Sequence, residues 1–354
     1  MNISQITNNQ KQQIAILWYG KEGQSMLHFL ERLDYPKNNI TLLDQKPITH
    51  TQYHSITWDH YIDNLNKFDI IFKSPGISPY HAKLLPVREK LSSGTEIFFD
   101  NYKGKVIWIT ATKGKSTIST LAYQCLKDAW YKVKLVWNIG TPVLKEIDIL
   151  NGEEYDYVIY ELSSYMLESF SPKLDIALLW NIYPDHLDWH QNIENYSQAK
   201  KNILSQAKTK YVYWELSQQL DIHDVQKYWT SWIVQYNDQK IYIDSDLFMN
   251  AADVLLQGDH NFINICWVLS IINSIWVSLA SAKNTIKNFR GLEHRLENIG
   301  TYNGITFIDD AISTTPESTI AGIKTFWGEV DTLFLGWNDR GYDFKKLWEC
   351  VGKY

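Results

Sequence analysis

One stretch constrains the fold of this chain more than any other. Residues 105–107 form a β-rich run, residues 108–117 read W-I-T-A-T-K-G-K-S-T, and apolar residues then recur at helical spacing up to Leu126. A strand, a Gly-Lys-Ser-Thr turn and a helix are the layout of a phosphate-binding loop, in which backbone N–H groups hold phosphate oxygens. Lys115 would add a positive charge, and the Ser116 hydroxyl would reach Mg²⁺. The stretch therefore predicts a nucleotide-binding α/β domain.

The loop departs from the standard form at one position. The pattern G-x-x-x-x-G-K-S/T places a glycine at position 109, where this chain has Ile109. Because the short sequence G-K-S/T also occurs by chance, coincidence is the alternative to nucleotide binding. The flanking strand and helix favour the nucleotide.

Length and composition exclude several classes of protein. The 354 residues suffice for two or three domains, and 45% hydrophobic with 21% charged residues is ordinary for a globular protein. A net charge of −6 argues against a general nucleic-acid surface. Three scattered cysteines and a polar N-terminus favour a reducing, cytoplasmic location without disulfides or zinc. Residues 262–280 are uncharged, but Asn and Ser interrupt them, which predicts a long buried helix rather than a membrane span.

Tryptophan and glycine occur in unusual proportions. The chain has 15 Trp and 17 Gly, whereas ordinary usage would give roughly 25 Gly. Trp cannot adopt a positive φ cheaply, nor let a ligand approach the backbone closely. We therefore hypothesise that several of these tryptophans are encoded by UGA, a codon that some bacteria read as glycine. The alternative is that they are genuine tryptophans in a diverged protein. The Trp residues at positions that favour glycine are Trp18, Trp108, Trp130, Trp137 and Trp337.

The N-terminal part of the chain has a Rossmann-like layout. Residues 14–20 predict a buried strand and a turn, a helix follows, and a second strand ends at Asp44. The turn reads W-Y-G-K-E-G and matches G-x-G-x-x-G only if Trp18 stands for glycine. The pattern is compatible with three alternatives: a dinucleotide-binding site, a site for another nucleotide, and an α/β core without a binding site. A further strand at 69–73 runs into S-P-G-I, which is either a ligand-binding turn at a strand's carboxyl end or a simple connection.

Acidic and histidine side chains follow the next strands. Glu161 ends a predicted strand at 157–160, where it suits Mg²⁺, with helix capping as the alternative. The loop D-H-L-D-W-H at 185–190 holds two Asp and two His, which indicates metal or phosphate chemistry with a hard cation rather than zinc. Lys200 lies on a predicted helix over 193–206, where a lysine is ordinarily a solvated charge.

The C-terminal part predicts only the beginning of another α/β unit. Residues 210–250 predict strands with short turns, and residues 305–308 and 332–335 predict two further strands with a helix between them. An independent domain usually needs about 100 residues. We therefore expect the last domain to be cut short.

Nine motifs, in this order, resemble those of the Mur ligases, which add amino acids to the peptidoglycan precursor. They are T-K-G-K-S-T, N-I-G-T-P, E-L-S-S-Y, N-I-Y-P-D-H-L-D-W-H, Y-S-Q-A-K, G-D-H-N-F-I-N, E-H-R-L-E, D-D-A-I-S-T-T-P-E-S-T and L-G-W-N-D-R-G-Y-D-F. K-E-G-Q-S, E-L-S-S-Y and D-R-G-Y-D-F are most similar to the D-glutamate-adding branch. The resemblance implies an α/β fold of three domains. These are a Rossmann-like UDP-precursor-binding domain (1–103), a central P-loop ATPase domain with a parallel sheet (104–291), and the truncated start of a Rossmann-like amino-acid-binding domain (292–354).

The resemblance also implies an activity. ATP, with Mg²⁺, would phosphorylate the alanine carboxylate of UDP-N-acetylmuramoyl-L-alanine, and D-glutamate would attack the acyl phosphate, releasing ADP and phosphate. The enzyme would be a cytoplasmic monomer of cell-wall synthesis, needed for cell shape and division, with no nucleic-acid partner and no membrane span.

Individual roles follow from the same resemblance. The catalytic residues would be Lys115, Asn138, His186 and Lys200, the last matching a lysine that the family carbamylates. The ligands of Mg²⁺ would be Ser116, Glu161, His186 and Lys200. The nucleotide would contact Gly114, Lys115, Ser116, Thr117, Asn261, Asn264, Arg295 and Asp310. The precursor would lie near Gly20, Asp44, Ser74 and Gly76, and D-glutamate near Thr314 and Arg340.

Several residues depart from the family pattern. Trp108, Ala111, Trp137 and Trp337 occupy positions of small residues, and literal indoles at 108 and 137 are expected to crowd the phosphate site. Ile312 stands where some relatives have lysine. Two alternatives follow: another Mur-type or folylpolyglutamate-type amide ligase, and an inactive nucleotide-binding fragment.

Overall fold

The computed structural model describes residues 1–49, 52–138, 140–168, 173–222, 226–228, 234–336 and 342–353. The chain divides into two compact units. One unit comprises Met1–Thr112 with Lys132–Gln226, and the other comprises Lys113–Tyr131 with Lys227–Tyr354.

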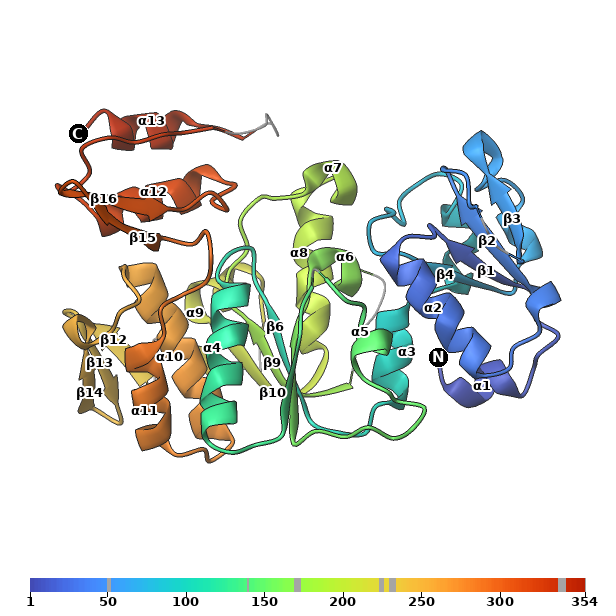
Figure 1. The fold of residues 1–354 in the computed structure, drawn as a ribbon, viewed down its shortest axis with the longest axis horizontal. Helices are drawn as coiled ribbons and strands as arrows, with labels where there is room; N and C mark the ends of the chain where they lie inside the picture. Colours follow the sequence, from blue (N-terminus) through green and yellow to red (C-terminus); the bar gives the residue numbers. More distant parts are fainter. Residues whose placement is uncertain are drawn as a thin grey trace. The chain divides into compact units, whose positions relative to one another are not determined.

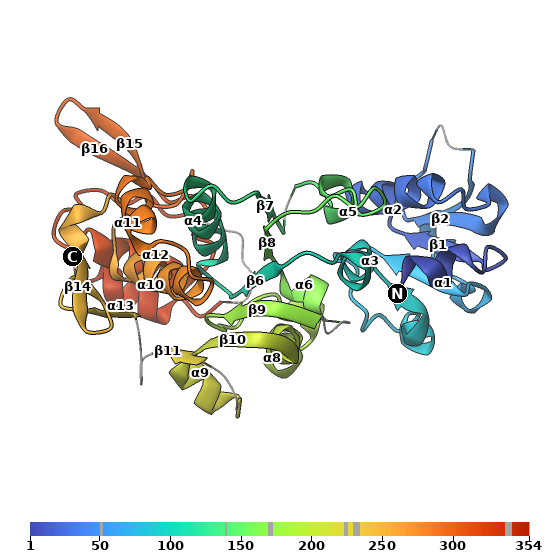
Figure 2. The same ribbon diagram turned by 90° about the horizontal axis from the view of Figure 1, so that it is seen from below.

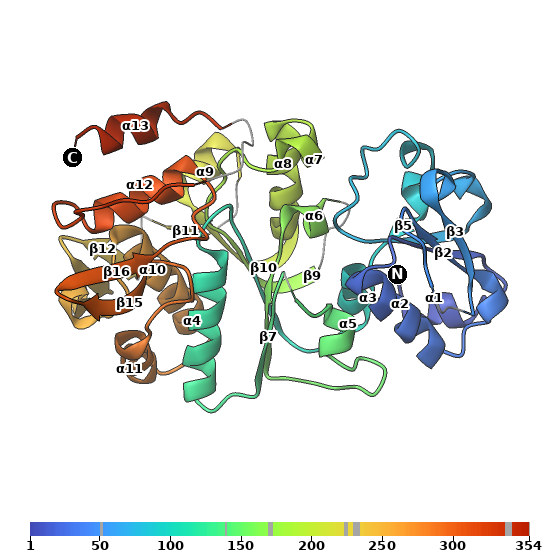
Figure 3. The ribbon, with the colours of Figure 1, turned by 45° about the horizontal axis from the view of Figure 1, so that its top comes forward.

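The first unit begins with a parallel sheet in the order β3-β2-β1-β4-β5. Strands β1 to β4 are labelled in Figure 1, and β5 is labelled in Figure 3. Strand β1 lies at its centre, and Ile14 pairs with Ile40 of β2 and with Ile70 of β4. This strand order is that of a Rossmann-type nucleotide-binding half, so the expected layout of the N-terminal part is confirmed. The strands are β1 (Ile14–Leu17), β2 (Ile40–Asp44), β3 (His54–Thr57), β4 (Ile70–Lys73) and β5 (Leu91–Ser92).

Helices of this region bury one apolar face each. Helix α2 (Lys21–Arg32) begins at Gly20 and buries Met26, Leu27 and Phe29 against the sheet's core. Because these residues follow one another at helical spacing, the sequence alone places the helix after the first strand. The other helical segments are α1 (Ile3–Thr7), α3 (Gly94–Asn101) and 3₁₀ turns at Lys37–Asn39, Trp58–His60, Leu65–Lys67 and Leu85–Lys90.

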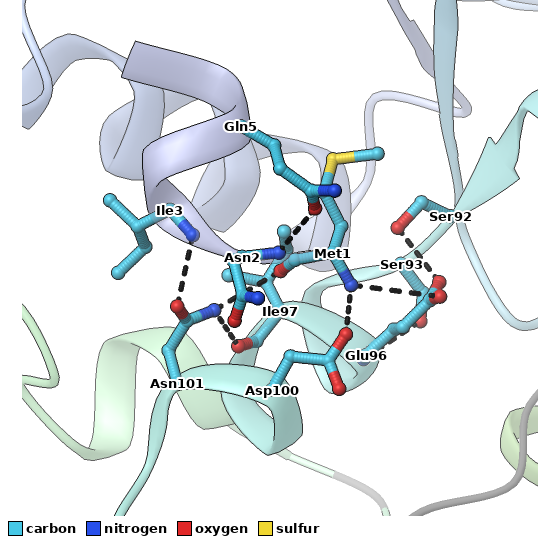
Figure 4. Close-up of polar contacts among 10 residues, drawn as sticks. All are labelled: Met1, Asn2, Ile3, Gln5, Ser92, Ser93, Glu96, Ile97, Asp100 and Asn101. Atoms are coloured by element: carbon cyan, nitrogen blue, oxygen red, sulfur yellow. Dashed lines mark hydrogen bonds and ion pairs between the residues drawn. The ribbon is translucent and has the colours of Figure 1, made fainter. Parts of the chain in front are cut away.

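Polar contacts tie α1 to α3 (Figure 4). The Asn101 side chain accepts a hydrogen bond from the Ile3 amide at 2.9 Å and donates one to the Met1 carbonyl at 3.1 Å. The Met1 amino group forms an ion pair with Asp100. These contacts fix the short helix α1, which is too short to be stable by itself.

A second sheet of six strands, in the order β11-β10-β9-β6-β8-β7, completes the first unit. The pairs from β10 through β9, β6 and β8 to β7 are parallel, as expected for the central part of the chain. The strands are β6 (Val106–Thr110), β7 (Val133–Val136), β8 (Tyr157–Glu161), β9 (Lys173–Leu179), β10 (Gln206–Tyr213) and β11 (Gln226–Tyr228). The helices are α5 (Val143–Glu146), α6 (Ser164–Leu167), α7 (Leu187–His190), α8 (Ile193–Lys201), α9 (Trp214–Gln219) and a 3₁₀ turn at Asn202–Leu204.

The second unit is built on three helices that lie side by side, α4 (Lys115–Asp128), α10 (Asp259–Ser274) and α11 (Leu279–Asn288) (Figure 1). Helices α12 (Pro316–Thr325) and α13 (Lys345–Val351) pack through Ile323, Leu347 and Cys350. Figure 2 shows the hairpin of β15 (Glu297–Tyr302) and β16 (Ile305–Asp309). An antiparallel sheet of β12 (Val234–Asn237), β13 (Lys240–Ile243) and β14 (Asp246–Asn250) precedes a 3₁₀ turn at Ala251–Asp253.

Some expected elements were wrong in extent or kind. Residues 332–335 form no strand, since no neighbouring strand pairs with them in the described part of the chain. The expected helix over 262–280 is two helices, because Trp276 has a φ of +60° and turns the chain between α10 and α11. The helix expected over 193–206 ends at Lys201, and the residues expected to be strands after 210 include helix α9. No helix among the described residues is long and apolar enough to cross a membrane.

Candidate functional site

The Gly-Lys-Ser-Thr turn has the backbone of a phosphate-binding loop. The chain leaves the fully buried strand β6 at Thr110 and enters α4 at Lys115. Gly114 caps the helix with a φ of +89°, a conformation that glycine adopts without strain. The positive end of the helix dipole and its N-terminal amides thus follow directly after the strand, which is the arrangement that binds phosphate.

Cationic and hydroxyl side chains of the second unit gather at the start of α4. Arg295 donates a hydrogen bond from Nη2 to Ser116 Oγ at 3.2 Å. Lys113 donates from Nζ to Thr314 Oγ1 at 3.1 Å. The structure therefore brings Arg295 and Thr314, both expected to contact ligands, to the predicted phosphate loop.

Asp310 is half-buried, and the two asparagines of α10 are buried. Asp310 accepts a hydrogen bond from the Leu296 amide at 3.2 Å, and burial raises the pKa of its carboxyl group. Asn264 donates from Nδ2 to Asn261 Oδ1 at 3.2 Å. Asn264 Oδ1 is buried and has no hydrogen-bond partner among the described residues. A buried amide oxygen without a partner is suited to a donor from a ligand.

Glu161 is the last residue of β8 and lies opposite Ile109 of β6. Its side chain is 4% exposed, and Oε2 is buried without a hydrogen-bond partner in the described part of the chain. An uncompensated buried carboxylate oxygen is unfavourable, whereas a bound cation would satisfy it. The burial of Glu161 thus fits its expected role as a ligand of Mg²⁺.

Lys200 is buried and not a solvated surface charge. The side chain is 2% exposed, and Nζ donates to the Ala111 carbonyl at 2.8 Å and to Thr110 Oγ1 at 3.3 Å. Nζ also lies 5.0 Å from the centre of the Tyr196 ring. Helix α8 therefore directs this lysine to the carboxyl end of β6, where the phosphate loop begins.

The D-H-L-D-W-H loop contains one half-buried and one fully buried histidine. His186 has a φ of +55°, and its ring packs on Tyr165 with the ring centres 4.9 Å apart. His190 is fully buried, and its Nε2 is 2.9 Å from Ser164 Oγ. Burial, reinforced by the charge of Lys200, lowers the pKa of His190 to about 4, so His190 is neutral near pH 7. Of the two histidines of this loop, His186 is therefore the one that is accessible to a ligand.

The four residues expected near the precursor lie around one turn. Gly20 begins α2, and both carboxylate oxygens of Asp44 accept backbone amides, from Tyr19 and Lys46. Ser74 donates from Oγ to the carbonyl of Trp18 at 3.0 Å. The turn lies at the carboxyl ends of β1, β2 and β4, where ligands bind in open parallel sheets.

The indole of Trp18 fills the space beside this turn. A Cβ atom added at Gly76 would lie 2.3 Å from Trp18 Cζ3, so the ring rests directly on the glycine backbone. Trp18 itself has a φ of +74°. The feature of the sequence that interrupts the glycine pattern thus also occupies the candidate precursor site.

Sequence reasoning missed a group of contacts that links this turn to the histidine loop. Trp189 donates from Nε1 to the Gly76 carbonyl at 3.0 Å, and Ser78 donates from Oγ to the Trp189 carbonyl at 2.7 Å. Lys73 donates from Nζ to the Ile77 carbonyl at 2.8 Å and lies 5.6 Å from the Trp189 ring centre. Burial lowers the pKa of Lys73 to about 8. A lysine at the end of the apolar strand β4 was the available signal.

Three of the remaining expectations concern residues in and around β6 and β7. The expectation that Trp108 crowds the phosphate loop is wrong, because its indole is fully buried in the core against Phe99 and Tyr160. Trp137 and Asn138 follow β7, and Trp137 is 39% exposed.

Two further residues of the sequence analysis, Arg340 and Trp337, lie outside the described residues.

Comparison with known proteins agrees with this geometry. Residues 109–272 match the family model of the Mur ligase middle domain. The chain is 33% identical, over 356 residues, to a UDP-N-acetylmuramoylalanine–D-glutamate ligase of Francisella tularensis subsp. mediasiatica. That alignment covers 98% of this chain and 79% of the relative.

Solved structures share the fold at low sequence identity. MurF from Acinetobacter baumannii superposes with a TM-score of 0.55 at 15% identity, covering 90% of this chain and 68% of MurF. The MurF ligase from Thermotoga maritima in complex with ADP gives 0.53 at 14% identity, covering 88% and 71%.

Proposed function

This chain belongs to the Mur ligase family, and from that premise we propose that it joins D-glutamate to UDP-N-acetylmuramoyl-L-alanine. Membership makes it an ATP-dependent ligase that forms amide bonds in peptidoglycan precursor synthesis. The choice of D-glutamate is supported by the 33% identity, over almost the whole chain, to ligases named for that amino acid. We further propose that the enzyme works as a monomer in the cytoplasm.

Two observations, one in each unit, support the proposal: α4 begins at a glycine cap, and the buried side chains of Glu161 and Lys200 lie at the carboxyl ends of β8 and β6. Gly114 gives the loop the backbone that accepts phosphate. Glu161 and Lys200 supply buried groups that solvent does not screen. We assign ATP binding to the domain of residues 104–291, precursor binding to residues 1–103, and amino-acid binding to the domain that begins at 292.

The residues fit a bound Mg²⁺. The buried, unpartnered Oε2 of Glu161 is the donor that a hard cation needs, and we propose Ser116, His186 and a carbamylated Lys200 as further ligands. When bound, the ion would neutralise charge on the phosphates of ATP. Carbamylation would give the Lys200 side chain a negative charge. The side chain would then bind a cation, whereas the unmodified amino group donates a hydrogen bond to the Ala111 carbonyl.

In the first step, a carboxylate oxygen of the precursor's alanine attacks the γ-phosphorus of ATP, and ADP leaves. Lys115 and Arg295, at the start of α4, compensate the charge on the transferring phosphoryl group. We propose that Asn138 holds the acyl group, and that Thr117, Asn261, Asn264 and Asp310 hold the nucleotide.

In the second step, the amine of D-glutamate attacks the acyl phosphate carbon. The bond from that carbon to the phosphate oxygen breaks, phosphate leaves, and the amine loses a proton to solvent. We propose that Thr314 and Arg340 orient D-glutamate, and that Gly20, Asp44, Ser74 and Gly76 position the precursor. Exclusion of water protects the acyl phosphate from hydrolysis.

The test is the dependence of phosphate release on both substrates. Purified protein is given ATP, Mg²⁺ and UDP-N-acetylmuramoyl-L-alanine, with D-glutamate, L-alanine, L-lysine or no amino acid. We expect phosphate release only with D-glutamate, and none when a folate replaces the precursor. Equal release with another amino acid or acceptor would assign the chain to a sibling ligase. Binding of ATP without any turnover would identify a non-catalytic nucleotide-binding protein.

A further inference from the structure

Four tryptophans adopt a backbone conformation that belongs to glycine. Trp18, Trp58, Trp130 and Trp276 have φ values of +74°, +65°, +66° and +60°. A left-handed conformation brings Cβ close to the carbonyl oxygen, and in a bulky residue it is a genuine outlier. The four tryptophans are therefore unfavourable at these positions unless their side chains gain something in return.

The number of such tryptophans is far above what their abundance explains. The described residues include 16 non-glycine residues with positive φ. With 15 Trp among 354 residues, a proportional share would be less than one. Eight of the other twelve residues are the types that are enriched in this conformation: Asp34, Asn64, His186, Asp221, Asp238, Asp244, His294 and Asn303. The remaining four are Gln191, Gln239, Ser245 and Leu296.

Trp130 occupies the glycine position of a helix-terminating motif after α4. The Trp130 amide donates to the Lys127 carbonyl at 3.0 Å, and the Tyr131 amide donates to the Leu126 carbonyl at 3.1 Å. These two bonds define the Schellman motif, in which the left-handed residue after the C-cap is usually glycine.

Trp276 repeats the same motif after α10. The Trp276 amide donates to the Asn273 carbonyl at 3.2 Å, and the Val277 amide donates to the Ile272 carbonyl at 3.2 Å. Two helices of different sequence thus end in the same way, each with Trp at the position where glycine is most strongly preferred.

The side chains offer no compensation at these positions. Trp130 is 95% exposed and Trp276 is 92% exposed, so their indoles reach into solvent. Trp58 is 62% exposed. The Trp18 indole lies against the backbone of Gly76, and a Cβ at Gly23 would lie 2.5 Å from the Trp18 carbonyl oxygen, so this turn is built for glycine. A large apolar side chain in solvent gains no burial energy that could offset a strained backbone.

Other tryptophans have ordinary surroundings for their type. Trp189 is 8% exposed and donates from Nε1 to the Gly76 carbonyl. Trp267 is fully buried within α10. The structure thus separates tryptophans that pack from tryptophans that only strain the backbone.

We propose that residues 18, 58, 130 and 276 are glycine in the protein made by its own cell, with UGA codons read as glycine. The inference rests on backbone geometry and is independent of the proposed function. It extends the hypothesis drawn from composition to positions 58 and 276, which the sequence pattern did not single out.

The direct test is the mass of tryptic peptides from protein purified from its own cells. Peptides 12–21 and 128–132 contain residues 18 and 130, and we expect each to be lighter by the difference between a tryptophan and a glycine residue. Residues 58 and 276 are expected to show the same substitution, and Trp189 and Trp267 serve as unchanged controls. Tryptophan at any of the four positions would overturn the proposal.

A second test uses recombinant protein with the printed sequence. Trp130→Gly is expected to raise the folding equilibrium constant about 5- to 30-fold, because the left-handed strain is removed. Trp130→Ala is the matched control, since it removes the indole but keeps Cβ, and it is expected to gain less. Trp267→Gly, at an ordinary helical position, is expected to lower the constant. A Trp130→Gly variant no more stable than Trp130→Ala would contradict the proposal, whatever the catalytic activity.

Discussion

Two turns of this protein have the same layout and differ in the residue that adopts a positive φ. The turn between β1 and α2 and the turn between β6 and α4 each follow a fully buried strand and lead into a helix. Each contains one residue at positive φ, which is Trp18 in the first and Gly114 in the second. Gly114 has no side chain that could cover the loop, whereas Trp18 places an indole over Gly76. The first turn therefore has the form of the second only when residue 18 is glycine, as we propose above for the protein made by its own cell.

The two turns also differ in charge. Lys115 and Arg295 belong to the second turn's surroundings, and they suit a triphosphate. In the first turn, Asp44 uses both carboxylate oxygens to hold backbone amides. These charges support our proposal that the second turn binds the phosphates of ATP and the first turn holds the precursor.

The largest effect is expected where the second turn loses its charge. Lys115→Ala should lower turnover about 10²- to 10³-fold, because the transition state loses a cation that compensates its developing charge. Steady-state kinetics with saturating ATP measures this. The control is Lys127→Ala, an exposed lysine on the same helix, which should leave turnover unchanged. An equal loss in both variants would mean that α4 had been destabilised instead.

Removal of the unpartnered carboxylate should weaken metal binding. Glu161→Gln is expected to lower the apparent affinity for Mg²⁺ by at least about 10- to 100-fold. Mg²⁺ should raise the thermal midpoint of the wild-type protein and not that of the variant, since binding to the native state stabilises it. Glu194→Gln, at the start of α8, is the matched control. A variant with unchanged dependence on Mg²⁺ would exclude Glu161 as a ligand.

The buried histidine should make stability depend on pH. Because the pKa of His190 is lowered to about 4 in the folded protein, the unfolded chain binds more protons between about pH 6.5 and 4. Stability should therefore be complete above pH 6.5 and fall by on the order of 1–3 kcal/mol as the pH drops to 4. His190→Phe keeps a ring in place and should flatten this slope, whereas His28→Phe, on the surface of α2, should not. The free energy of unfolding at several pH values measures the slope, and equal slopes would show that another group is responsible.

The first turn can be converted into the form of the second. Trp18→Gly should lower the Michaelis constant for the precursor about tenfold, since the indole no longer covers Gly76. Trp58→Gly removes another tryptophan at positive φ and should raise stability without changing this constant. If both variants shift the Michaelis constant alike, the space over Gly76 is not the precursor site.

The smallest effect is expected in the contacts between the first turn and the histidine loop. Trp189→Phe keeps the ring but loses the hydrogen bond to the Gly76 carbonyl, which should destabilise the protein by about 1 kcal/mol. The Michaelis constant for the precursor should rise several-fold while turnover changes less. Trp180→Phe, which follows β9, is the control. A loss of turnover without a change in the Michaelis constant would contradict this positioning role.

The sequence predicted the elements whose signals are local. The apolar run 106–110 indicates a buried strand, and the Gly-Lys-Ser-Thr turn indicates the start of a helix. Tertiary contacts do not change either structure. The nine ordered motifs also led to the family. Local patterns were thus sufficient for both parallel sheets and the phosphate loop.

Other features depend on residues far apart in the chain. The burial of Lys200 requires α8 to face β6, and nothing on its own helix indicates this. The hydrogen bond from Trp189 to Gly76 joins residues that are separated by more than 100 positions. The end of α10 was missed because Trp276 stands where a glycine would have marked the stop.

The central claim is that the alanine carboxylate is activated by phosphoryl transfer before D-glutamate attacks. We would label that carboxylate with heavy oxygen, supply ATP, Mg²⁺ and D-glutamate, and measure the mass of the released phosphate. We expect each phosphate to carry one labelled oxygen from the carboxylate, and we expect its release to require D-glutamate. Unlabelled phosphate would contradict it, because ATP would then have been hydrolysed by water.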